Sequence, residues 1–240
     1  PSIRYVESSN GHIHQFITDT KDTKEISSSF IPSIHEAIFD GQAKSVVYRY
    51  LDSTGKEIES FLGVLGAESG QYLPKNIISL TSSPENSSYF YIKEDLGGGA
   101  IGTLFTPAGS KSTKIFNSNF KEWNADWPDE SYVYVNTKPS WDTEGAVYSI
   151  NTSTGIFTKI LSGVRGMTSK VNQNSTKMLY SKTTPRGPEL NIYTIKSGTT
   201  INLGIYTFAD KCVFAFNMLD IYCAVPLNAP SENNPDLWYQ

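Results

Sequence analysis

The sequence is poor in cysteine, histidine and clustered positive charge, and each shortage argues against a class of protein. Only two cysteines and three histidines occur in 240 residues, and no CxxC pair is present, so we expect no metal site. The net charge is −4 and the lysines and arginines are scattered, so we expect no nucleic-acid partner. No run of about 18 apolar residues occurs, so we expect no membrane span within this chain.

Signatures of common enzymes are missing as well. The glycine-rich stretch "DLGGGAIG" at 95–102 lacks the GK[ST] ending of a phosphate-binding loop, and we read it as a turn entering a hairpin. No GxSxG sequence marks a nucleophilic serine. We therefore expect no cofactor and no catalytic residue that a motif would identify.

Residues typical of strands are plentiful, whereas the strong helix formers Ala, Leu and Glu are scarce. The chain has 14 Tyr and 12 Phe, together with many Ser, Thr and Gly, which favours β structure. No window shows apolar residues at the i, i+3, i+4, i+7 spacing of an amphipathic helix. The composition therefore predicts an all-β protein.

A repeat of about 43 residues organises the chain. Five segments each contain a short apolar strand, a polar turn and a second strand that ends on tyrosine. The tyrosines are Tyr48, Tyr91, Tyr134, Tyr180 and Tyr222, with separations of 43, 43, 46 and 42 residues. Between them lie segments such as "GAVYSINTSTGIFTKIL" at 145–161, which alternate in polarity around a turn and read as β-hairpins.

Two hairpins per period give four antiparallel strands, the signature of a propeller blade. Since one blade cannot bury both of its faces, stacked blades share a core. We predict a single β-propeller domain or segment over residues 1–240. Its approximate blade units are 1–30, 31–76, 77–121, 122–166, 167–208 and 209–240. A sandwich of unrelated strands is the alternative, but its strands need not recur at a fixed interval.

The turns and hairpins resemble a known family. The turns Ser83–Glu85 and Pro128–Glu130, and the hairpins Tyr148–Gly155 and Ile192–Gly198, are similar to blades of the Tol-Pal translocation protein B (TolB-like) propeller. That family belongs to the tryptophan–aspartate-repeat-like propellers. The resemblance covers almost the whole chain and implies a propeller fold and an envelope setting. It implies no activity, because many functions are grafted on this fold.

A closer resemblance is to uncharacterised propeller proteins of candidate-phylum bacteria. It rests on the stretches Ile3–Phe16, Lys211–Pro226 and Asp236–Gln240. These relatives usually carry an N-terminal membrane anchor and continue beyond the equivalent of Gln240. The resemblance therefore implies an extracytoplasmic protein, periplasmic or on the cell surface, with a possible anchor upstream. It also favours a segment of a seven-bladed ring over the alternative, a closed five-bladed ring.

Both cysteines lie in one predicted hairpin. Cys212 and Cys223 are equidistant from the Asn217–Met218 peptide, so a tight two-residue turn there places them opposite each other. Opposed strand residues have Cβ atoms about 4.5–5.5 Å apart, slightly wider than a relaxed disulfide prefers. We predict a Cys212–Cys223 disulfide, which favours an oxidising compartment. Two buried thiols are the alternative.

Two functions are compatible with the sequence. The first is a non-enzymatic binding or scaffold module for a protein or glycan, with loop residues of one face as contacts. The candidate contacts are Trp141, Arg186, Trp238 and Tyr239. The alternative is a glycoside hydrolase with carboxylates in the central channel, drawn from Glu36, Glu122 and Asp126, which flank or lie on innermost strands. We favour the binding module.

Overall fold

The structure, a computed structural model, describes residues 1–67, 70–107 and 112–227 of the chain. Within these ranges the backbone forms strands in six antiparallel sheets, and one short 3₁₀ turn is the only helical element. The predicted all-β class and four-stranded antiparallel sheets are confirmed. No helix in these ranges has the length and hydropathy to cross a bilayer.

The sheets are named A to F in chain order. Sheet A contains β1 (Ser2–Val6), β2 (Ile13–Ile17) and β3 (Thr23–Ser27). Sheet B contains β4 (Ile34–Phe39), β5 (Ser45–Leu51), β6 (Ile58–Val64) and β7 (Gly70–Tyr72). Sheet C contains β8 (Ile77–Ser82), β9 (Tyr89–Glu94), β10 (Ala100–Phe105) and β11 (Ser112–Ser118).

Sheets D and E are also four-stranded, and sheet F is a hairpin. Sheet D contains β12 (Trp123–Asp129), β13 (Tyr132–Thr137), β14 (Glu144–Asn151) and β15 (Phe157–Arg165). Sheet E contains β16 (Thr168–Val171), β17 (Lys177–Thr184), β18 (Gly187–Thr194) and β19 (Thr199–Tyr206). The 3₁₀ turn η1 (Ala209–Lys211) leads into sheet F, formed by β20 (Cys212–Phe214) and β21 (Ile221–Cys223).

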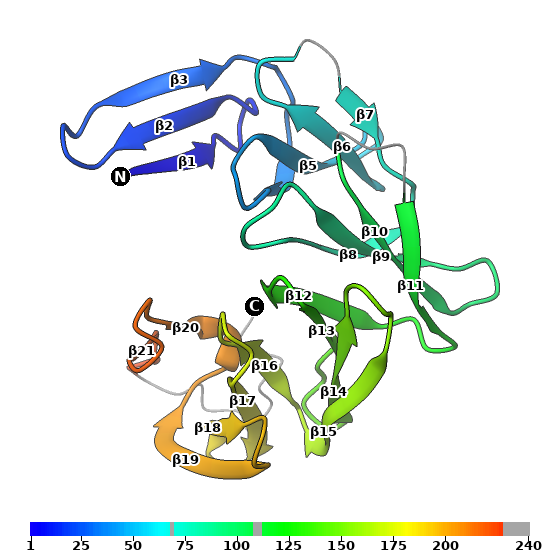
Figure 1. Ribbon diagram of the computed structural model, residues 1–240, viewed down its shortest axis with the longest axis vertical. Coiled ribbons are helices and arrows are strands. Elements are labelled where there is room, and N and C mark those ends of the chain that lie inside the picture. Colours follow the sequence, from blue (N-terminus) through cyan, green and yellow to red (C-terminus); the bar gives the residue numbers. More distant parts are fainter. Residues whose placement is uncertain (68–69, 108–111, 228–240) are drawn as a thin grey trace.

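The sheets follow one another around an arc in chain order, from the N-terminal sheet A to the hairpin β20–β21 (Figure 1). The first strands of sheets B to E contact one another in sequence and form the hub. β1 pairs only with β2 and β21 only with β20, so the described strands do not close a ring. The number of blades in a complete ring, seven or alternatively five, stays a prediction.

The core lies between the sheets because side chains alternate along each strand. Phe90 and Ile92 of β9 pack against sheet D, whereas Tyr89 and Tyr91 at the alternate positions pack against sheet B. All four are at most 7% exposed. Burying a large apolar side chain contributes about 1.5–3 kcal/mol, so sheet C is stabilised from both faces by its neighbours.

The five repeat tyrosines lie on the second strand of their sheets, but they do not all face the same way. Tyr48, Tyr91 and Tyr180 pack against the preceding sheet, whereas Tyr134 packs against sheet E, which follows it. Tyr222 also points away from the preceding sheet and is 66% exposed. The sequence repeat therefore identifies the strand of each tyrosine, whereas the face that the side chain occupies differs at two of the five positions.

The short connection between β12 and β13 is the reason for the reversal at Tyr134. Asp129 pairs with Tyr132, which leaves only residues 130–131 as the turn, and the register of β12 shifts just before it. In sheets B and E the corresponding turns span residues 40–44 and 172–176. Since side chains alternate with a period of two, a shift of one residue moves a side chain to the other face.

The turns between first and second strands have the same conformation in sheets B and E despite different sequences. The side chain of Asp40 accepts hydrogen bonds from two backbone N–H groups of its turn, and Asn172 does the same in sheet E. Three residues later, Ala43 and Ser175 have φ values of 50° and 53°. Asp and Asn favour such turns because their short side chains bond the nearby backbone.

Sheet F confirms the predicted disulfide and corrects the predicted turn. Cys212 and Cys223 are directly opposed and bonded. The expected two-residue turn at Asn217–Met218 is wrong, because the N–H of Ala215 donates to the carbonyl of Asp220 at 2.9 Å and leaves a four-residue turn at 216–219. The side chain of Asn217 accepts two backbone hydrogen bonds inside this turn, which stabilises the wider form.

Candidate binding site at the hub

A hollow of about 440 Å³ opens at the hub between the first strands of sheets D and E. We call it the hub hollow. No described residue of its lining is aromatic. Its principal polar lining residues are Asn124, Asp126, Asn136, Lys138, Lys170 and Asp210.

Strand alternation on β12 places the polar residues in the hub hollow. Trp123 and Trp127 pack into the core between sheets C and D. Asn124 and Asp126 occupy the alternate positions and line the hub hollow. Because successive strand residues point to opposite faces, the sequence "WNADW" encodes one apolar face and one polar face. The same strand therefore supports the core and supplies the candidate site.

Side chains connect neighbouring sheets at the hub. The N–H of Ala125 on β12 donates to Ser79 Oγ on β8 at 2.9 Å. On the other side of β12, Lys170 Nζ of β16 lies 3.2 Å from Asp126 Oδ1. These contacts fix β12 between its two neighbours, so the walls of the hub hollow are held from both sides.

The three acidic residues that the sequence places near the hub each form an ion pair. The pairs are Glu36 with Arg49 at 2.8 Å, Glu122 with Lys138 at 3.4 Å, and Asp126 with Lys170 at 3.2 Å. Two of these three pairs border the hub hollow. The hub hollow therefore presents positive and negative charge side by side.

A second hollow, of about 350 Å³, shares the Asp126–Lys170 ion pair with the hub hollow. It lies toward the turn residues Pro84 and Gln173, and its lining includes Trp127. The ion pair thus borders both hollows. A ligand entering from either side meets the same two charges.

Asp129, at the end of β12, is a partly buried acid near the hub. Burial raises the pKa of its carboxyl group, while hydrogen bonds from the N–H groups of Ser131 and Tyr132 act in the opposite direction. Its Oδ2 is buried and has no hydrogen-bond partner among the described residues. Burial also raises the pKa of the neighbouring Tyr134. Neither residue lines the hub hollow, so we expect Asp129 and Tyr134 to affect stability rather than binding.

The loops that carry Trp141 and Arg186 flank the same glycine. Trp141 follows Lys138 in the loop between β13 and β14, and its side chain is 38% exposed. A Cβ added at Gly166 would lie 3.1 Å from the Trp141 carbonyl oxygen and would collide with Thr183, just before the turn of Arg186. Both loops therefore lie at one end of sheets D and E. Their role in binding stays a prediction.

Two further predicted contacts, Trp238 and Tyr239, lie outside the described residues. The hub hollow is also lined by charged and amide residues that the sequence analysis did not identify, namely Asn124, Asn136, Lys138, Lys170 and Asp210. The available signal was the polar residues at alternating positions of the "WNADW" strand. Amide and lysine side chains on a strand are common on solvated faces, so this pattern alone does not distinguish a site.

No family model matches the sequence, and no curated protein matches it. Solved structures are similar in fold. The chain matches TolB from Acinetobacter baumannii with a TM-score of 0.56 and 14% identity, over 84% of this chain and 52% of that one. It matches the β-propeller domain of the Trilobed protease from Pyrococcus furiosus with a TM-score of 0.59 and 13% identity, over 84% and 66%.

An oligogalacturonate lyase from Vibrio parahaemolyticus matches with a TM-score of 0.61 and 14% identity, over 84% of this chain and 62% of that one. The chain thus spans between about half and two thirds of the length of these proteins. Identities this low show the fold alone. The fold that these matches support for this chain is a β-propeller.

Proposed function

We propose that this chain is a non-enzymatic β-propeller module that holds an extended segment of a protein partner in the hub hollow. The observation that carries the proposal is the lining, which combines amide side chains with paired charges of both signs and contains no aromatic residue among its described members. Amides and charges match the polar groups of an extended polypeptide. A glycan partner is less well matched, because sugar rings pack best against aromatic faces.

Trp141 and Arg186 are proposed to contact the partner at the rim of the hub hollow. Trp and Arg dominate binding energies at interfaces because each buries a large area or forms several hydrogen bonds at once. The Trp141 loop begins at Lys138 and Pro139, which line the hub hollow. An extended partner that leaves the hub hollow on this side would contact the Trp141 loop. Trp238 and Tyr239 stay candidate contacts.

An extracytoplasmic, envelope-associated setting is part of the proposal. Disulfides persist in oxidising compartments, and the Cys212–Cys223 bond is one. A membrane anchor upstream, and the kinship with propeller proteins of candidate-phylum bacteria, rest on the sequence resemblance alone.

The alternative is a glycoside hydrolase, which needs two carboxyl groups about 5–9 Å apart and free to reach the substrate. Each candidate carboxylate is already engaged by a lysine or arginine. Productive substrate binding would have to displace these cations. This cost favours the binding module, although the similar structures include a lyase.

Selection of random peptides on the chain tests the proposal. We expect peptides that bind the wild type and bind Lys170→Glu at least about tenfold more weakly, because the new charge repels Asp126 and breaks the ion pair. The matched control is Lys196→Glu, which makes the same charge change in the exposed turn between β18 and β19 and should leave the affinity unchanged.

Two parallel assays address the alternatives. A glycan array and a panel of chromogenic glycosides are tested with the same three proteins. Peptides that bind all three proteins equally would place the site elsewhere. Glycoside cleavage that is lost in Asp126→Asn would replace the binding module with the hydrolase.

A further inference from the structure

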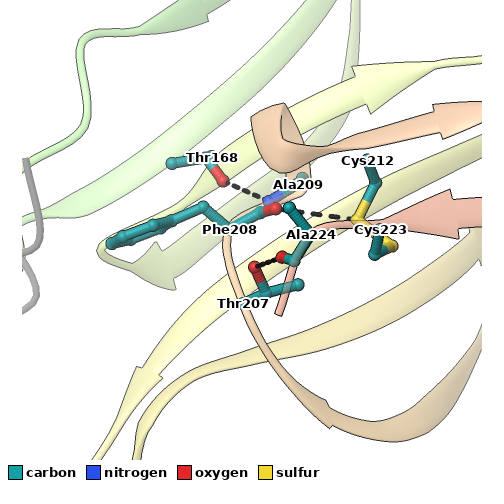
Figure 2. Close-up of a disulfide and its surroundings, with 7 residues drawn as sticks. All are labelled: Thr168, Thr207, Phe208, Ala209, Cys212, Cys223 and Ala224. Carbon is teal, nitrogen blue, oxygen red and sulfur yellow. Dashed lines mark hydrogen bonds between the residues drawn. A yellow bond between two sulfur atoms is a disulfide. The ribbon is translucent and has the colours of Figure 1, made fainter. Parts of the chain in front are cut away.

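The short segment η1 connects the hub hollow to the disulfide. Asp210 of η1 lines the hub hollow, and Cys212 follows two residues later. Figure 2 shows that the segment 207–209, Cys212 and the returning strand residues Cys223 and Ala224 form one compact group. Any movement of this group therefore moves one wall of the hub hollow.

Sheet E holds one side of η1. The N–H of Ala209 donates to Thr168 Oγ1 of β16 at 2.9 Å, as drawn in Figure 2. The Thr168 hydroxyl is in turn 2.7 Å from Ser181 Oγ of β17. Thr168, Ser181 and Ala209 are buried. Buried hydrogen bonds of this kind specify one position for η1, because leaving either partner unpaired costs free energy.

The hairpin β20–β21 holds the other side of η1. Thr207 Oγ1 donates to the carbonyl of Ala224 at 2.7 Å, and the N–H of Ala224 donates to the carbonyl of Lys211 at 2.9 Å. Cys212 Sγ lies 3.7 Å from the carbonyl oxygen of Phe208, which is a van der Waals contact because a disulfide sulfur carries no hydrogen. Ala224, the residue that follows β21, thus supports η1 directly through its hydrogen bond to Lys211.

The hairpin is too short to hold this arrangement by hydrogen bonds alone. Each of its strands has three residues, and it pairs with no other strand among those described. A two-stranded hairpin is marginally stable in water. The disulfide spans 11 residues, and in the chain-entropy model a loop of that size lowers the open population about 100-fold.

We propose that the Cys212–Cys223 disulfide positions Asp210 in the wall of the hub hollow, so that the hub hollow binds its partner in the oxidised form and loses affinity when the bond is reduced. This inference rests on the proposed function. The reductant is a dithiol: its thiolate attacks one sulfur, the Cys212–Cys223 bond breaks, and a second exchange releases the dithiol as a cyclic disulfide. Two electrons and two protons end on the two cysteine thiols.

Hydrogen exchange tests the positioning without any partner. Oxidised wild type, wild type reduced with dithiothreitol, and the Cys212→Ser/Cys223→Ser variant are compared by mass spectrometry. We expect exchange in residues 207–224 to accelerate by about 100-fold after reduction, while β12 and β17 keep their rates. Reduction of the folded wild type keeps the test valid if the double variant fails to fold. Unchanged exchange in 207–224 would overturn the inference.

A peptide that is selected on the wild type and depends on Lys170 is called a hub-selected peptide. Its affinity tests whether the disulfide is coupled to binding in the hub hollow. We expect reduction and Asp210→Asn each to weaken the peptide at least about tenfold, with Asp210→Asn leaving the hydrogen exchange of the oxidised chain unchanged. Lys196→Glu serves as the matched control in both redox states. Accelerated exchange with unchanged peptide affinity would overturn this inference alone. Failure to select any peptide dependent on Lys170 would overturn the proposed function, and this inference with it.

Discussion

Truncation of two tyrosines from the same repeat position should have very different costs. Tyr180 is 6% exposed between sheets D and E, whereas Tyr222 is 66% exposed on the outer face of sheet F. A fully enclosed Tyr buries about 200 Å². At about 25 cal/mol per Å² of area removed from water, Tyr180→Ala lowers the free energy of unfolding by about 4.7 kcal/mol. Tyr222→Ala lowers it by about 1.7 kcal/mol, and both values are upper bounds. The expected difference is about 3 kcal/mol.

Urea unfolding followed by tryptophan fluorescence measures this difference. The comparison uses the shift of the midpoint at constant slope, which isolates a change of stability. Tyr180→Phe is the control, because it removes only a hydroxyl whose hydrogen bond to Thr200 is long, at 3.5 Å. We claim that stacking between sheets, rather than the position in the sequence repeat, determines how much each tyrosine contributes to stability. Equal losses of unfolding free energy for Tyr180→Ala and Tyr222→Ala would refute this claim.

Three further changes have defined outcomes. Ala43 has a φ of 50°, so Ala43→Gly should relieve strain and raise the melting temperature by about 2–4 °C, or about 1 kcal/mol; a lower melting temperature would contradict this. Burial raises the pKa of Asp129 above its usual 3.8, so the folded chain binds this proton more tightly and loses stability as the pH rises through the folded pKa. The stability of Asp129→Asn relative to wild type should therefore increase as the pH rises above about 4 in urea titrations, and a constant difference would exclude the shift. Trp141→Ala should weaken a hub-selected peptide about 30-fold, equivalent to about 2 kcal/mol, when the affinity is measured well below the melting temperature of the variant; an unchanged affinity would remove Trp141 from the rim.

Much of the fold could be predicted from the sequence because the repeat reflects local patterns. Strand alternation and polar turns recur about every 43 residues, and each repeat folds as one sheet. The direction of each side chain could not be predicted as well. Tyr134 shows why: a turn three residues shorter than those of sheets B and E, together with a register shift in β12, reverses its face while the spacing of the tyrosines hardly changes.

The candidate site was only partly accessible to sequence reasoning. Asp126 was identified because an acid near an innermost strand invites a chemical role. Its partner Lys170 lies in the next repeat, and nothing in the local sequence connects the two. The pairing arises from the stacking of sheets D and E, a long-range consequence of the fold. Asp210 was missed for the same reason, since η1 reaches the hub through its contacts with sheet E, which include the hydrogen bond from Ala209 to Thr168.

Photo-crosslinking at the hub tests the central claim most directly. Benzophenone-alanine is introduced in place of Asn136, which lines the hub hollow, and separately in place of Lys196 in the exposed turn between β18 and β19. After irradiation with extracts of the native envelope, the account predicts that position 136 captures a polypeptide, that a hub-selected peptide blocks this capture, and that position 196 captures none. Equal capture at both positions, or capture that the peptide does not block, would contradict it.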